Sequence, residues 1–259
     1  MATKWRWSWA IPLVLAGVIA GAGLGAAPSM TTAPASAPGA AAASAGATSP
    51  ASMAAVWTPD YSSPAAAAKT LLIAIHKGDF AAVRQALTIP DPQKENIGTL
   101  LDAMEASAEL QAAATDRFQE AGSAAFGAPT EAALAAQLKA VDAGELTLKG
   151  DAATLVMAAD AAAKLPGGTV EFKKMGSDWK IDGAAFFKLT AEPADKTAAR
   201  VELASRLTII TQTITQQIGA GKFFSANDAY QEYWMDYLDL TRPAATATAP
   251  APATTPAKP

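Results

Sequence analysis

Few side chains in this sequence could do chemistry on their own. The chain has one histidine, His76, and no cysteine. These counts exclude a histidine-containing catalytic triad, a multi-histidine metal site, thiol catalysis, disulfides and zinc held by cysteine. His76 is predicted to lie in the last turn of a helix, where an imidazole interacts favourably with the helix C-terminus. The functional alternative puts it at the mouth of a pocket, beside Asp79.

Carboxylates recur along one predicted helical segment. They are Asp102, Glu105, Glu109, Asp116 and Glu120. On a helix this series is most simply the solvated face, and a carboxylate metal site is the alternative. The pair Gly167-Gly168 has no phosphate-binding fingerprint around it, so it indicates a turn. We therefore predict no metal and no cofactor.

Aromatic residues near the C-terminus recur at three- and four-residue spacing. They are Tyr230, Tyr233, Trp234 and Tyr237. This helical spacing is typical of core packing. If the stripe is exposed instead, it forms, together with Phe223 and Phe224, a docking surface for another protein or a glycan.

Four short segments alternate with period two, which predicts two β-hairpins. The first spans residues 145–159 with a turn at Gly150-Asp151, and the second spans residues 169–183 with a turn at Gly176-Ser177. The side chains expected on the dry face are Leu146, Leu148, Leu155, Met157, Val170, Phe172, Trp179 and Ile181. None of them titrates, so this face supplies no acid or base.

Among these inward residues, four are predicted to line an apolar pocket. They are Leu155, Met157, Phe172 and Trp179. The opposite face is predicted to carry the solvated residues Glu171, Lys173, Lys180 and Asp182. Since no residue has a catalytic role in this arrangement, the sequence favours a protein that is not an enzyme.

Helices are predicted on both sides of the hairpins. Ser63-Pro64 begins the first, over residues 65–77, and Gly78 ends it. The others are expected over residues 80–87, 94–126 (one helix or two), 129–144, 193–219 and from Ser225 onward. Asp79 is predicted to cap the second helix, and Ser225 with Asp228 to form a capping box at the start of the last. In the helix after Pro193, an apolar stripe is formed by Leu203, Leu207, Ile210, Ile214 and Ile218. The fold class is therefore α+β, with an antiparallel sheet of about four strands packed on helices.

The segment from Ser63-Pro64 to Gly78-Asp79-Phe80, followed by hairpins ending in Gly176-Ser-Asp-Trp-Lys-Ile-Asp182, resembles the nuclear transport factor 2-like superfamily, which includes SnoaL-like and ketosteroid-isomerase-like proteins. The resemblance implies a curved, cone-like antiparallel sheet wrapped around helices. It carries no specific function, because such folds host enzymes, binders and scaffolds. Residues 94–126 then form an inserted long helical segment, and the helices after Pro193 are C-terminal additions.

The two ends of the chain differ from the middle. Lys4 and Arg6 precede an apolar run, so residues 1–27 are predicted to be a signal peptide or an uncleaved N-terminal anchor. Residues 28–55 form an Ala/Ser/Thr/Pro-rich linker, residues 56–241 the α+β domain, and residues 242–259 a Pro/Ala/Thr-rich tail. The protein is thus expected to be exported, to the periplasm, the cell surface or the medium, with membrane contact only through an uncleaved N-terminus.

The formal net charge is −4, with no basic stripe in the predicted domain, which excludes a nucleic-acid partner. The favoured interpretation is a non-catalytic domain that binds an apolar small molecule or a protein partner. One alternative is a pocket enzyme of isomerase or hydrolase type, with polar groups supplied by the helices. Another is a structural module in which the C-terminal helices form a homodimer.

Overall fold

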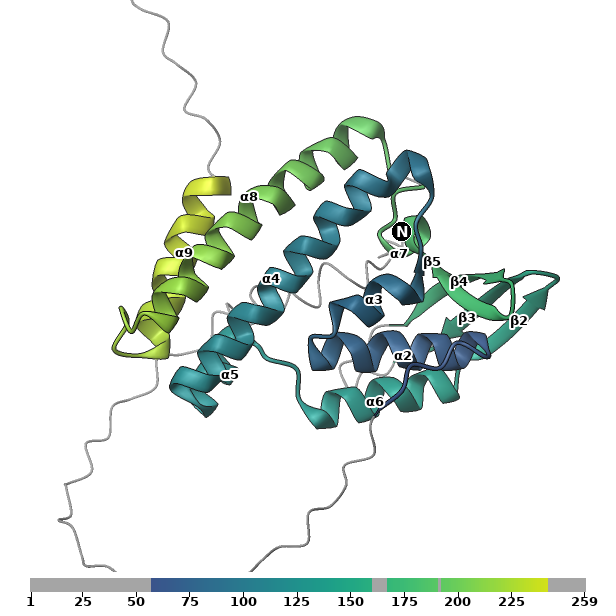
Figure 1. Cartoon of the computed structure of the whole chain (residues 1–259), viewed down its shortest axis with the longest axis horizontal. Coiled ribbons are helices and arrows are strands. Elements are labelled where there is room, and N and C mark those ends of the chain that lie inside the picture. The colour runs from purple at the N-terminus through teal and green to yellow at the C-terminus, as the bar shows by residue number, and fades with distance from the viewer. Residues whose placement is uncertain (1–56, 160–166, 191, 242–259) are drawn as a thin grey trace, which may run out of the picture. The chain divides into compact units, whose positions relative to one another are not determined.

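The computed structural model describes residues 57–159, 167–190 and 192–241 (Figure 1). The predicted signal segment, linker and tail lie outside these residues. Contacts divide the described residues into two compact units, of which the first holds residues 57–93, 129–159 and 167–190. The second holds residues 94–128 and 192–241.

The first unit begins with two helices whose ends match the sequence signals. α2 spans Pro64–Lys77, and its N-cap Ser63 accepts a hydrogen bond from the Ala66 N–H at 3.1 Å. Gly78 ends it with φ 68°, a left-handed conformation that favours glycine. The Asp79 carboxylate caps α3 (Phe80–Ala86) by accepting from the Ala82 N–H at 3.0 Å.

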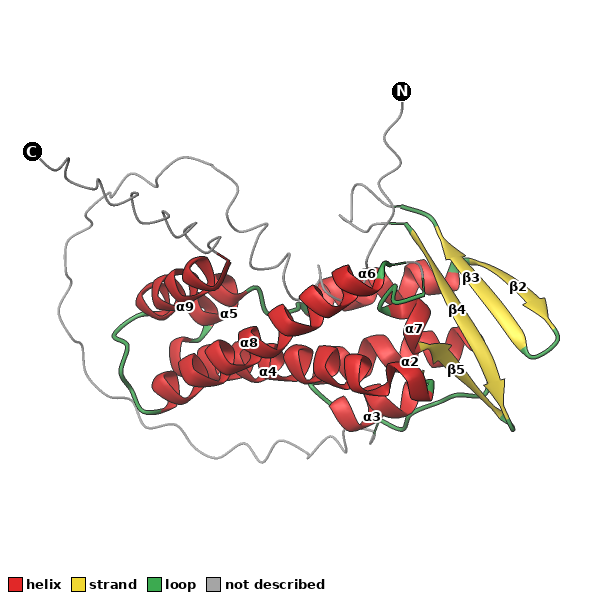
Figure 2. Cartoon of the chain, turned by 90° about the horizontal axis from the view of Figure 1, so that it is seen from above, coloured by secondary structure: helices red, strands yellow, loops and turns green. Residues whose placement is uncertain are grey.

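Two hairpins form most of the sheet, as predicted. β2 (Glu145–Lys149) pairs antiparallel with β3 (Ala152–Met157), and β4 (Gly168–Met175) pairs antiparallel with β3 and β5 (Asp178–Asp182). The strand order is β1-β5-β4-β3-β2, so β2 is an outer edge, as Figure 2 shows.

The prediction of a purely antiparallel sheet of about four strands is wrong in one respect. A fifth strand, β1 (Leu87–Thr88), pairs in parallel with Ile181 and Asp182 of β5, so the sheet is mixed. The sequence pattern predicts Leu87 as the last residue of a helix. It is extended instead, with ψ 145°, because α3 ends at Ala86 and the Thr88 hydroxyl donates to the Ile181 carbonyl at 3.2 Å.

Helices cover one face of the sheet. α2 contacts β3 and β5, and α6 (Glu131–Asp142), capped by Thr130, contacts α2 and β3. The covered face carries the predicted inward residues, of which Leu155, Phe172 and Ile181 are fully buried. The short helices η1 (Asp91–Gln93) and α7 (Gly183–Phe186) complete the described part of this unit.

The second unit is helical. α4 (Lys94–Phe118) and α8 (Ala194–Gly219) pack along each other, α5 (Glu120–Phe126) returns against α4, and α9 (Ala226–Thr241) packs on α5 and α8. Of the two possibilities for residues 94–126, one helix or two, the structure shows two. The break is at Gln119, whose φ of 55° is incompatible with a continuing right-handed helix.

The start of α9 confirms the capping box that the sequence predicts. The Ser225 N–H donates to the Asp228 carboxylate at 3.1 Å, and the Asp228 N–H donates to the Ser225 hydroxyl at 3.2 Å. Within the described ranges, no helix has the length and apolar character needed to span a membrane.

Candidate functional site

His76 is paired, but not with Asp79. Its Nε2 lies 3.0 Å from the Oε1 of Glu131 on α6, whereas the Asp79 carboxylate is used as the cap of α3. The tautomer with its proton on Nε2 donates to that carboxylate, which leaves the buried Nδ1 without a hydrogen-bond partner. Glu131 is exposed, so this pair resembles a surface contact between two helices more than an acid–base site.

The carboxylate series on α4 and α5 forms no metal site in the part of the chain that the structure describes. Asp102, Glu109, Asp116 and Glu120 are exposed, and Glu105 is half-buried. This agrees with the solvated-face interpretation for the four exposed residues.

The four residues predicted to line an apolar pocket lie on the covered face of the sheet. Leu155, Met157, Phe172 and Trp179 are all buried. The backbone N–H of Trp179 donates to the Tyr61 carbonyl at 2.8 Å, and the Lys174 ammonium lies 5.9 Å from the centre of its ring. These side chains are therefore part of the packing between the sheet and the helices, and their lining of an apolar pocket stays a prediction.

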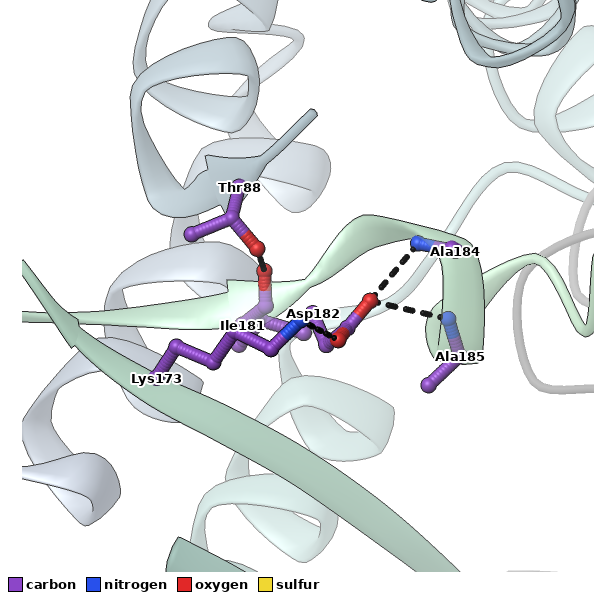
Figure 3. Close-up of polar contacts among 6 residues, drawn as sticks. All are labelled: Thr88, Lys173, Ile181, Asp182, Ala184 and Ala185. Atoms are coloured by element: carbon purple, nitrogen blue, oxygen red, sulfur yellow. Dashed lines mark hydrogen bonds and ion pairs between the residues drawn. The ribbon is translucent and has the colours of Figure 1, made fainter. Parts of the chain in front are cut away.

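One residue of the opposite face is not where the sequence pattern puts it. Asp182 is expected in solvent, yet it is buried, and Figure 3 shows why. Its Oδ1 accepts from the Ala184 and Ala185 N–H groups at 3.0 and 3.1 Å, capping α7. Its Oδ2 is 2.6 Å from the Nζ of Lys173. With both oxygens committed to these contacts, Asp182 is a structural carboxylate.

The aromatic stripe of α9 divides between core and surface. Tyr233 is buried, and both Tyr230 and Tyr233 make edge-to-face contacts with Phe126 of α5, at centroid distances of 5.8 and 6.2 Å. Burial raises the pKa of Tyr233, and a hydrogen bond to Thr211 opposes that rise. Trp234 and Tyr237 are half-buried and stack on each other at 5.2 Å. Core packing is thus the main role of the first two rings.

An open groove lies between α8 and α9, within the second unit. Its volume is about 380 Å³. Its lining residues are Arg206, Ile209, Ile210, Asp236, Asp239 and Leu240. Three of these residues are apolar, and the other three carry charges of both signs.

Several apolar side chains of the groove and of its neighbours in sequence are exposed. Ile209, which lines the groove, is 63% exposed, and Met235 and Leu238 of α9, each next to a groove residue in sequence, are exposed as well. Phe224, in the loop before α9, is 100% exposed, while its neighbour Phe223 is buried. Concentrations of exposed apolar residues on a folded protein usually mark an interaction site.

The sequence analysis did not predict this groove, although residues on both helices indicate it. The apolar stripe of α8 runs through Leu207, Ile210 and Ile214, so Ile209 is an isoleucine on the polar side of the helix. On α9, Asp236, Asp239 and Leu240 are at the three- and four-residue spacing of one helix face.

A scan against protein-family models finds no match, and searches of curated proteins and of solved structures find none either. The chemistry and surface of the residues themselves therefore carry the functional argument.

Proposed function

We propose that this chain is a non-catalytic, exported assembly domain whose α8–α9 groove binds an apolar segment of a partner protein. The observation that carries the proposal is the exposed Ile209, which lines the groove together with two other apolar residues, Ile210 and Leu240. Isoleucine is among the residue types most often buried, and hiding such a side chain from water is worth about 1.5–3 kcal/mol. Ile209 is left mostly uncovered in this chain.

The groove resembles a protein interface in its composition. Its lining combines three apolar residues, Ile209, Ile210 and Leu240, with three charged ones. Protein interfaces likewise combine apolar contacts with polar and charged residues. The partner segment is therefore an amphipathic helix with apolar residues at three- and four-residue spacing and a basic residue that faces Asp236.

The assignment as non-catalytic has separate support. His76, Asp79 and Asp182 each have a structural contact, as a helix–helix pair or as a helix cap. None of these residues is among those lining the groove. Export rests on the basic and apolar pattern of residues 1–27.

Photo-cross-linking tests the proposal. Ile209 is replaced by p-benzoylphenylalanine in the full chain, which is then irradiated in its own cells. We expect one discrete adduct that I210D abolishes and that Q231D, a substitution on the exposed side of α9, leaves unchanged. No adduct, or the same adducts from a cross-linker at Gln231, would contradict the proposal.

The mass of the adduct identifies the occupant. An increment equal to the chain itself indicates the C-terminal dimer and overturns the partner proposal, while a different protein mass supports it. The intact mass of the same purified protein tests export, because loss of about the first 27 residues is expected of a cleaved signal.

We keep the relationship to the nuclear transport factor 2-like superfamily, with its cone-like sheet, as a hypothesis of fold. Helices α2 and α3 precede two antiparallel hairpins along the chain, with α4, α5 and α6 between them, and this order supports the hypothesis. An experimental structure in which the sheet does not curve around α2 would contradict it.

A further inference from the structure

The outer strand β2 leaves one side of its backbone unpaired within the sheet. It is bonded to β3 on one side and lies at the end of the strand order, as Figure 2 shows. In an antiparallel ladder, every second residue of an edge strand directs its N–H and C=O groups away from its neighbour. Such a row is a ready template for another strand.

β2 lacks most of the features by which proteins prevent an edge strand from pairing with another strand. All five of its residues are exposed, none is proline, and the ladder with β3 runs through five consecutive pairs without a bulge. Its one basic residue, Lys149, is at the end of the strand. The edge is therefore regular and accessible along its whole length.

The apolar face of the sheet also continues onto β2. Leu146 lies opposite Leu155, and Leu148 lies opposite Ala153, so both leucines point to the helix-covered side. Leu155 and Ala153 are buried, yet Leu146 is 39% exposed and Leu148 is 59% exposed. The hydrophobic face thus extends past its helical cover to the free edge.

The sequence of this strand, Glu145-Leu-Thr-Leu-Lys149, is complementary to itself when reversed. We propose that β2 pairs antiparallel with β2 of a second copy, about a twofold axis through Thr147. Glu145 then faces Lys149 of the second copy, twice, and each Leu146 faces a Leu148 on the same side of the joined sheet. Opposite charges directly across a ladder stabilise it, and like charges destabilise it.

The complementarity selects one register. A parallel pairing sets Glu145 beside Glu145 and Lys149 beside Lys149. A shift of one residue brings Leu146 opposite Thr147 and turns the leucines to the wrong face. Among the antiparallel registers, only the one centred on Thr147 pairs all five residues, and its interface is closed by twofold symmetry.

The interface is small. A five-residue pairing lies below the roughly 1,600 Å² of a standard stable interface, so we expect association that depends on concentration. The proposal uses only residues of the first unit and does not rest on the α8–α9 groove.

Charge reversal in the full chain tests the pairing by sedimentation velocity at low salt. E145K and K149E each place like charges across both contacts, so each should weaken the dimer by about tenfold or more. An equimolar mixture of the two should regain it, because the lysines of one chain meet the glutamates of the other. The double variant E145K/K149E should dimerise like the natural chain.

Two single-cysteine variants test which residues face each other across the proposed pairing. The chain has no cysteine, so T147C is its only thiol. Residues directly opposite in an antiparallel pair have Cα atoms about 4.5–5.5 Å apart, within the range of a disulfide. T154C is the matched control, because Thr154 pairs with Thr147 one strand further in and would be roughly 14 Å from its equivalent.

The expected result is rapid disulfide dimerisation of T147C, slowed by K149E, and little dimerisation of T154C. Three results would overturn the proposal: a natural chain that stays monomeric at millimolar concentration, a dimer indifferent to both charge reversals, or equal cross-linking at both positions. A dimer that is indifferent to both charge reversals would use another surface, such as α9.

Discussion

Gly122 lies where α5 turns back against α4, and replacing it should have a large effect. A Cβ built on Gly122 would be 2.0 Å from the Ala114 carbonyl oxygen and 2.4 Å from its carbon. Carbon–oxygen contacts in proteins are about 3.3–3.6 Å, so α5 would have to move by roughly 1.3 Å or more. Since these are backbone atoms of a helix, rotation of a side chain cannot relieve the overlap.

The magnitude follows from three contributions to the free energy of unfolding. Overpacking costs about 1–3 kcal/mol, and moving α5 also draws the buried Phe126 away from Tyr230 and Tyr233, giving up part of a burial worth about 1.5–3 kcal/mol. Alanine in a helix returns at most about 1 kcal/mol relative to glycine. We expect G122A to destabilise the protein by about 2–4 kcal/mol.

Gly98 is the matched control, because it lies in α4 and a Cβ added there would meet open space, with no neighbouring atom within 4 Å. G98A should stabilise by about 0.5–1 kcal/mol. With a urea m-value of about 1–3 kcal/mol/M, the unfolding midpoint by circular dichroism should fall by about 1 M or more in G122A and rise slightly in G98A. Amide exchange should quicken in α5 and α9 of G122A. Equal stability of G122A and the natural chain would refute the packing of α5 on α4.

Two further predictions concern buried polar groups. D182A removes the acceptor of two α7 N–H groups and should lower the free energy of unfolding by about 2 kcal/mol. D182N keeps an oxygen acceptor and loses only the ion pair with Lys173, whose side chain is 56% exposed. It should therefore lower the free energy of unfolding by about 1 kcal/mol or less. If urea titrations show that D182A and D182N lower it equally, the capping role is contradicted. Because burial raises the pKa of Tyr233 above its ordinary value of 10.0, its contribution to stability is complete below pH 10 and is lost as the pH rises through the higher folded value. Y233F should remove that alkaline loss, and an unchanged stability profile above pH 10 would show that another group is responsible.

Local signals predicted most of the element boundaries in the described residues. Ser63 with Pro64, Gly78, Asp79 and the Ser225–Asp228 box act over four residues or fewer, so their outcome depends little on the rest of the chain. Hairpin turns are equally local. The strand phase was also right, because the period of two allows only one face to be apolar.

What the sequence could not provide depends on distant contacts. β1 exists because two residues meet β5 more than ninety positions later, and nothing near Leu87 distinguishes it from the end of a helix. Asp182 alternates like a solvated residue, but the chain turns into α7 directly after it and uses its carboxylate as a cap. The NTF2-like resemblance, the export of the chain and its partner stay predictions.

The residues that carry both proposals are those that periodicity does not explain. A stripe on α8 and a dry face on the sheet account for the buried apolar side chains, since burial is what selects those positions. Ile209 lies off its stripe, and Leu148 lies on the dry face but beyond its cover. Because Ile209 and Leu148 are 63% and 59% exposed, they contribute little to the stability of the single chain. We therefore expect substitutions there to change association while leaving the unfolding midpoint almost unchanged. That separation of association from stability is the pattern expected if these surfaces serve binding.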